Sequence, residues 1–119
     1  KEIVRVKSGE STNPFSSINK QIQYHDHSNI IGFKIDSRFI LDHEDHEIDL
    51  GCLEAAINAF DADKVYNDKA KLAREAKEIV DVLTSNSLPA AYCHGWAIQI
   101  CGLSGKVSTV ELVADKLYV

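Results

Sequence analysis

Histidines in two short clusters are the side chains whose types and spacing best suit chemistry. His25 and His27 stand two positions apart, which places both on one face of an extended segment. His43 and His46 stand three apart, which places both on one face of a helix. Neutral imidazole nitrogens together with a carboxylate can hold Zn²⁺ or a similar ion. The spacing therefore predicts a candidate metal site in the first half of the chain.

Carboxylates lie beside these histidines and could complete such a site: Asp26, Asp42, Glu44 and Asp45. In a metal-dependent hydrolase, Glu44 or Asp45 would act as the general base. Neither short pattern is a longer zinc signature such as H-E-x-x-H. The alternative is that the first pair occupies a hairpin tip, and that residues 42–47 form a polar connector whose negative charge favours the start of the next helix.

The three cysteines suggest a disulfide and one leftover thiol. An unbroken strand would separate Cys93 and Cys101 by about 26 Å, which is beyond disulfide reach. The workable bridge therefore joins Cys52 to Cys93 or to Cys101 and closes a loop of roughly 40 to 50 residues. The alternative is that all three are buried free thiols in a reducing compartment.

The Cys93-His94 dipeptide does not predict a catalytic dyad. Consecutive side chains of a strand point to opposite faces, so His94 would face away from Cys93. No cysteine-hydrolase signature, glycine-rich phosphate loop or G-x-S-x-G motif occurs in the sequence. We expect Trp96 to be a packing aromatic whose neighbour Gly95 has no side chain to obstruct it. These observations predict no catalytic residue and favour a protein without enzymatic activity.

Length and charge narrow the class of protein. The 119 residues, 45% of them hydrophobic, fit one domain with a single core. No apolar run reaches the roughly 18 residues that a membrane-spanning helix needs. With 13 Lys and Arg against 18 Asp and Glu, the formal net charge is -5. Because the acidic excess repels phosphate backbones and the cations are scattered, we expect no binding to nucleic acid.

The first third of the chain has the alternation typical of strands. Residues 2–7 predict a strand and residues 8–17 a loop. Residues 18–24 and 30–35 predict a hairpin that turns at residues 25–29, and residues 38–41 extend the same sheet.

The remaining chain predicts helices on one side of that sheet. Asp49 is a plausible N-cap for a helix over residues 50–60, and a longer amphipathic helix should cover residues 67–83. Residues 90–101 predict a central strand. Ser108 and Glu111 form an S-x-x-E capping box that predicts a short terminal helix, although the β-branched residues there also permit a strand. The expected fold is α+β, with four or five antiparallel or mixed strands and two or three helices packed on one face.

The second half of the chain offers a family resemblance. Cys52 heads the expected helix, and the following strand carries Cys93, Gly95, Trp96 and Cys101 before a short closing element. Residues 50–119 in this respect resemble small secreted fungal proteins of the killer-toxin-like α/β-sandwich type. That family usually has several disulfides, whereas this chain can form at most one. The resemblance implies an exported toxin or virulence effector that binds a host or target-cell protein without a catalytic centre.

Three functions follow from the sequence. The first is a secreted binding protein of toxin or effector type, which the absence of Met and the start at Lys1 favour as features of a processed domain. The second is a hydrolase or metal-binding module with Zn²⁺ at the histidines, whereas the first needs no cofactor. The third is a cytoplasmic immunity or adaptor protein whose charge of -5 would complement a basic partner.

Overall fold

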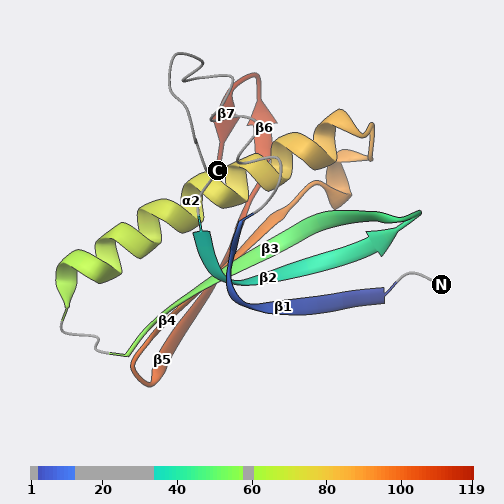
Figure 1. The fold of residues 1–119 in the computed structure, drawn as a ribbon. Helices are drawn as coiled ribbons and strands as arrows, with labels where there is room; N and C mark the ends of the chain where they lie inside the picture. Colours follow the sequence, from blue (N-terminus) through green and yellow to red (C-terminus); the bar gives the residue numbers. More distant parts are fainter. Residues whose placement is uncertain (1–2, 13–33, 58–60) are drawn as a thin grey trace, which may run out of the picture.

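A five-stranded mixed sheet crossed by a long helix dominates the structure (Figure 1). The structure, a computed structural model, describes residues 3–12, 34–57 and 61–119. The strands lie in chain order across the sheet: β1 (Ile3–Thr12), β2 (Lys34–His43), β3 (His46–Ala56), β4 (Gly95–Cys101) and β5 (Ser104–Val110). Neighbouring strands are antiparallel except β3 and β4, which are parallel.

Helix α2 (Ala62–Ser85) connects the two parallel strands and covers one face of the sheet. The Asp61 side chain caps it by accepting a hydrogen bond from the Lys64 amide at 3.1 Å. One stripe of α2 is buried against Ile35, Cys52 and Ala97 of the sheet and consists of Leu72, Ala76, Ile79 and Leu83. The predicted helix over residues 67–83 is confirmed and is longer at both ends.

The end of the chain packs on the same helix. The 3₁₀ turn η1 (Ala90–Tyr92) precedes β4, and β6 (Leu112–Ala114) pairs with β7 (Leu117–Tyr118). The Tyr118 hydroxyl donates a hydrogen bond to Asp81 of α2, and the Lys77 ammonium lies 4.6 Å from the centre of the Tyr118 ring. These contacts fix the small hairpin against α2.

The prediction of two or three helices is wrong, because the described residues contain one α-helix. Most of residues 50–60, predicted as a helix, belong to β3, where Cys52, Glu54 and Ala56 are buried on alternate positions. The buried Glu54 interrupts the apolar alternation that marks a strand. The terminal helix is also wrong, since residues 104–110 pair with β4 as β5 and later residues form β6 and β7. The β-branched alternative was the better interpretation.

Several boundaries also differ from expectation. Part of the predicted loop over residues 8–17 belongs to β1, and the predicted hairpin turn at residues 25–29 lies outside the described residues. The polar block of residues 42–47 forms the β2–β3 hairpin, with Glu44 and Asp45 at φ values of 46° and 64°. Positive φ at both central residues is the geometry of a type I′ turn, which matches the twist of paired strands. The strand predicted from residue 90 begins at Gly95.

A buried ion pair joins the two strands of the β2–β3 hairpin. Arg38 of β2 is 1% exposed and Asp49 of β3 is 5% exposed. The guanidinium donates two hydrogen bonds to the carboxylate, at 2.8 Å from Nε and 2.5 Å from Nη2. Because both charges are out of water, this two-point contact is needed to compensate their lost hydration. Asp49 is therefore a partner of Arg38 in a strand and not the predicted helix cap.

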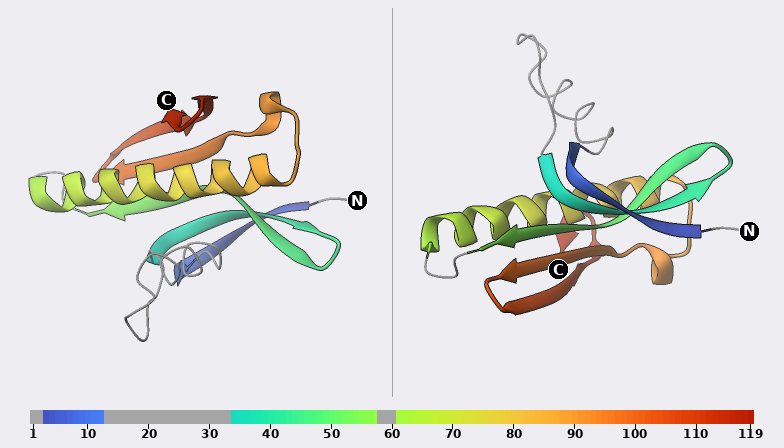
Figure 2. Two further views of the ribbon diagram at one scale, coloured as in Figure 1. Left: turned by 90° about the horizontal axis from the view of Figure 1, so that it is seen from above. Right: turned by 60° about the horizontal axis from the view of Figure 1, so that its bottom comes forward.

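Gly95 sets the distance between α2 and β4. Figure 2 shows α2 running along β3 and β4 in both views. A Cβ atom at Gly95 would lie 2.2 Å from the carbonyl oxygen of Ala76, which is helix backbone and cannot turn aside. We expected the missing side chain of Gly95 to let Trp96 pack closely, but Trp96 is 50% exposed and the close neighbour of Gly95 is the helix. Within the described residues, no helix is long and apolar enough to cross a membrane.

The Gly95 contact yields a stability prediction. Gly95→Ala should lower the free energy of unfolding by about 3 kcal/mol, because the added methyl forces α2 away from β4. Gly105→Ala is the matched control, since its Cβ would have no neighbour closer than 3.8 Å, and it should change stability by less than about 0.5 kcal/mol. Urea unfolding measures both. Equal midpoints for the two variants would contradict the close contact.

Candidate functional site

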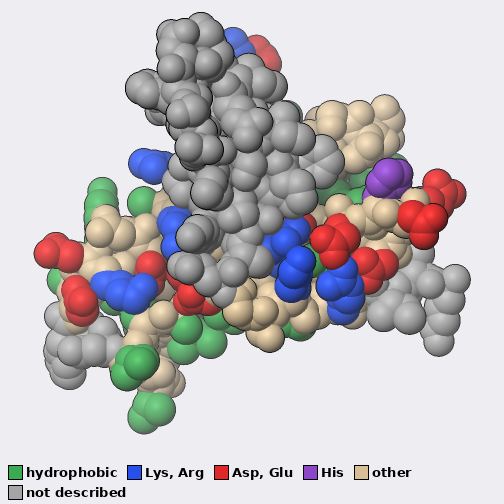
Figure 3. All heavy atoms as spheres, in the orientation of Figure 1, with side chains coloured by type: hydrophobic (Ala, Val, Ile, Leu, Met, Phe, Trp, Pro, Cys, Tyr) green, Lys and Arg blue, Asp and Glu red, His purple; other side chains and the backbone are tan. Residues whose placement is uncertain are grey.

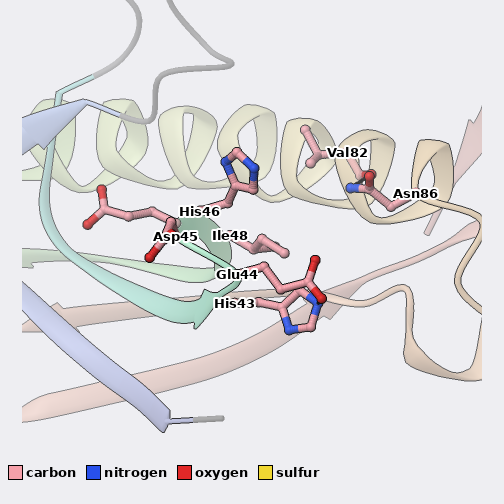
Figure 4. A pocket seen from close by; sticks show the side chains of 8 residues that line it. His43, Glu44, Asp45, His46, Ile48, Val82 and Asn86 are labelled. Atoms are coloured by element: carbon pink, nitrogen blue, oxygen red, sulfur yellow. Dashed lines mark hydrogen bonds and ion pairs between the residues drawn. The ribbon is translucent and has the colours of Figure 1, made fainter.

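The predicted histidine site is only partly described and does not assemble there. His25 and His27 lie outside the described residues. His43 and His46 face each other across the ends of β2 and β3 and line a cavity of about 600 Å³ with Val82 and Asn86 of α2. In Figure 4 the two rings lie apart, His46 on the side of α2 and His43 beside Glu44. The pair is on strands, so the expected shared helix face is absent.

The carboxylates expected to help those histidines have other positions. Asp42 accepts a hydrogen bond from Arg5 Nε at 2.5 Å, and this contact lowers the pKa of its carboxyl group. Glu44 and Asp45 occupy the exposed turn, where Glu44 Oε1 lies 3.9 Å from His43 Nε2. Acidic side chains and a histidine gather at this hairpin end in Figure 3. Across the described ranges, no three or more His, Cys, Asp and Glu side chains are grouped so that they could hold a metal ion.

The cysteines are free thiols in the structure. Cys52 is buried under α2, and burial raises the pKa of its thiol strongly, which makes it unreactive. The Cys93 thiol contacts the carbonyl oxygens of Leu88 and Pro89, each at 3.5 Å, while His94 lies 3.7 Å from Glu111. Cys93 and His94 thus have separate partners and form no dyad. The bridge from Cys52 to Cys93 or Cys101 is not formed and stays a prediction.

A row of polar residues crosses the sheet at its opposite end, far from the histidines. Gln99 of β4 pairs with Glu54 of β3 on one side and with Lys106 of β5 on the other. Asp36 of β2 precedes Ser37, whose partner is Leu53, so Asp36 stands beside Glu54. We call these four residues the polar row. Glu54 and Gln99 lie two positions before the last residues of β3 and β4. Asp36 and Lys106 lie two positions after the first residues of β2 and β5.

The first half of α2 adds charged groups above this row. Lys71 Nζ lies 2.6 Å from Glu54 Oε1. Lys64 Nζ lies 3.0 Å from Asp68 Oδ2, and Asp68 is 5% exposed. Five charged residues meet at this site, and we call them the carboxylate-lysine cluster: Asp36, Glu54, Lys64, Asp68 and Lys71.

Hydrogen bonds to backbone groups fix the two residues that flank Glu54 in the polar row, Asp36 and Gln99. Gln99 Nε2 donates a hydrogen bond to the Val65 carbonyl oxygen of α2 at 2.8 Å. Asp36 Oδ2 accepts one from the Ala55 amide at 2.8 Å. Both side chains therefore have a defined orientation on either side of Glu54, which is the kind of support that a preorganised site requires.

Glu54 is the most strongly perturbed acid of the cluster. It is 1% exposed, and its burial raises the pKa to about 7, against an ordinary value of 4.5. Lys71 opposes this rise, and the nearby Asp36 carboxylate adds to it. A carboxyl group that titrates near neutral pH between an acid and a lysine is suited to proton transfer or to cation binding.

The sequence contained little that could have revealed this site. Asp36, Glu54 and Lys71 are separated by 18 and 17 positions and belong to three elements. Glu54 offered one signal, as a charged residue within an otherwise apolar and small-residue segment. The helix predicted over residues 50–60 included this position without assigning it a role. Comparison with protein-family models, with curated proteins and with solved structures finds no match.

The titration of Glu54 makes stability depend on pH in a defined direction. A folded-state pKa of about 7 against 4.5 means that the folded chain binds this proton more tightly, so stability falls as pH rises between these values. The cost at pH 8 should be about 2–3 kcal/mol. Glu54→Gln removes it and should make the protein more stable than wild type at pH 8, with little difference at pH 4.5.

The control for this experiment is Glu44→Gln, which removes an exposed carboxylate from the hairpin turn. Urea unfolding at a series of pH values should give the control the wild-type pH dependence between 4.5 and 8. The burial argument fails if Glu54→Gln and Glu44→Gln show the same dependence.

Proposed function

We propose that this chain hydrolyses phosphate esters at the carboxylate-lysine cluster, with a divalent cation bound between Asp36 and Glu54. The observation that carries the proposal is the buried Glu54 carboxyl group, which has a pKa of about 7 and lies between Asp36 and Lys71. The site lies at the carboxyl ends of the adjacent parallel strands β3 and β4, where open sheets with helical crossovers place their ligands.

Charge balance supports a cation. When Glu54 is ionised, the cluster contains three carboxylates against two ammonium groups. A proton on Glu54 restores the balance, which agrees with its raised pKa. A bound metal ion would also balance the negative charge, but Glu54 would have to release its proton first. Metal binding should therefore depend on pH.

The donors suit Mg²⁺ or Mn²⁺. Two carboxylates are hard oxygen ligands, and Mg²⁺ is commonly held by one or two of them while water and substrate phosphate oxygens fill its remaining positions. Asp36 is half-buried, and the Lys71 side chain is 28% exposed, so the cluster is open to solvent beside Glu54.

Each residue has a role in this proposal. Asp36 and Glu54 would hold the ion, which would supply positive charge to the phosphate and to the attacking water. Lys71, held against Glu54, stabilises the negative charge that grows on the phosphate oxygens in the transition state. Asp68 keeps Lys64 beside the cluster as a second positive group, and Gln99 maintains the spacing between α2 and β4.

Metal binding and hydrolysis test the proposal together. Mn²⁺ binding measured by electron paramagnetic resonance should weaken about tenfold for each pH unit below 7, because Glu54 must lose its proton. Asp36→Asn and Glu54→Gln should abolish this binding and lower hydrolysis of bis(p-nitrophenyl) phosphate by at least about 100-fold. Lys71→Gln should keep Mn²⁺ bound but lower kcat by about 10 to 100-fold.

The control variant is Asp45→Asn, which removes a carboxylate from the hairpin turn and should leave both measurements unchanged. Mn²⁺ binding that survives in Asp36→Asn and Glu54→Gln would contradict the site. Wild-type protein without metal-dependent hydrolysis of either this diester or p-nitrophenyl phosphate would contradict the function.

A second candidate function, the secreted binding protein inferred from the sequence, is favoured by a different surface. On the sheet face away from α2, a cavity of about 390 Å³ is lined by Phe39, Tyr92 and Trp96, among others. Trp96 is 50% exposed and Tyr92 is 72% exposed. Half-exposed aromatic side chains on an uncharged face are typical of protein interfaces. We propose this face as the binding surface if the chain is an exported toxin or effector.

Cysteine oxidation separates this candidate from a role inside a reducing compartment. Protein isolated from its natural source, with thiols blocked and mass measured without reductant, should contain one disulfide and one free thiol if it is exported. Three blocked thiols per chain would contradict export.

A further inference from the structure

A groove between α2 and the edge strand β5 lies beside the carboxylate-lysine cluster. It has a volume of about 350 Å³, within the range of small-molecule sites. Its lining comes from both elements and from β4 and includes Lys69, Leu72, Ala73, Gln99, Lys106 and Val110. Gln99 also neighbours Glu54 across the β3–β4 pairing, so the groove continues directly from the polar row.

Among the described residues, Lys69 of α2 and Lys106 of β5 lack the acidic partners that the other lysines of α2 have. Lys64, Lys71 and Lys77 each pair with a carboxylate within 3.0 Å. Lys69 and Lys106 form no ion pair with any described residue, although the chain has an acidic excess of -5. Two uncompensated ammonium groups beside one cavity favour an anionic ligand.

Most of the remaining lining is apolar, so the groove favours a ligand that has an apolar part as well as a negative charge. Leu72 and Ala97 belong to the buried core, and Ala73 and Val110 add small apolar surfaces. Burying an apolar ring against these side chains removes it from water, which a bare inorganic anion cannot do. Adjacent strands are about 4.8 Å apart, so Lys106 lies about 10 Å from Glu54 across the sheet. One compound can therefore contact both regions.

We propose that this groove binds the ring-bearing group of a phosphate ester, with Lys69 and Lys106 contacting its phosphate. Because Lys106 lies about 10 Å from Glu54, the phosphate held in the groove is not the one cleaved at the cation, and the substrate of the proposed hydrolase carries a second phosphate, as in a nucleotide with two or more phosphates. This inference rests on the proposed function for its reaction, but binding in the groove requires neither the cation nor Glu54.

Isothermal titration without divalent cations tests the groove independently of catalysis. Phenyl phosphate and adenosine monophosphate should each bind wild type at least tenfold more tightly than inorganic phosphate. The tighter of the two distinguishes an aryl from a nucleoside ligand, and either order supports the groove. Lys69→Gln combined with Lys106→Gln should weaken binding of both compounds at least tenfold, and Ala73→Phe should do so by filling the groove.

Lys7→Gln/Lys116→Gln is the matched control, because it removes two positive charges outside the groove, from β1 and from the β6–β7 turn. It should bind as wild type. Glu54→Gln should also retain binding while losing hydrolysis, so failure of the groove and failure of the proposed function give different results. Equal affinity for inorganic phosphate and the two ring-bearing phosphates, or unchanged binding in the Lys69/Lys106 double variant, would overturn the inference.

Discussion

The parallel pairing of β3 and β4 is the constraint on which the rest of the structure depends. Two parallel neighbours cannot be joined by a short turn, so the chain must return along the sheet, and α2 is that return. Because β2 and β5 are antiparallel to these central strands, they begin where β3 and β4 end. Side chains from four strands and from the first turns of α2 therefore meet at one end of the sheet. The polar row is a consequence of this topology.

The two buried acids of β3 illustrate different ways to place a carboxylate in a core. Asp49 receives two hydrogen bonds from Arg38, so its charge is compensated and its position is fixed. Glu54 is equally buried, but Lys71 beside it is partly exposed and a second acid lies close by. Its ionised form is therefore disfavoured, which reduces stability near neutral pH. A carboxyl group held in this condition remains available for a proton or for the proposed cation, at a cost to stability.

Sequence patterns predicted those parts of the fold whose stability is local. The 3.6-residue periodicity of α2 was clear because five of its seven buried residues are apolar, the exceptions being Asp68 and Glu75. The pattern misled at β3, where Glu54 occupies a buried position, and at the C-terminus, where the S-x-x-E motif favours a helix but pairing with β4 decides. Both errors have the same physical origin: long-range contacts override local preference. The site was missed for a related reason, since Asp36, Glu54 and Lys71 become neighbours only through sheet register and the crossover.

The charges of the chain are distributed unevenly, so the net charge does not describe the surface at the groove. An acidic excess of -5 argues against a phosphate-bearing ligand only if the surface is uniform. Glu44 and Asp45 lie at the hairpin end of β3, ten and nine residues from Glu54 and therefore about 30 Å away along the strand. That distance exceeds the Debye length of about 8 Å at physiological ionic strength, so these acids exert little repulsion at the groove. Lys69 and Lys106 are close to it and have no acidic partner among the described residues. The local charge at the groove, rather than the total charge of the chain, is therefore what bears on the proposed anionic ligand.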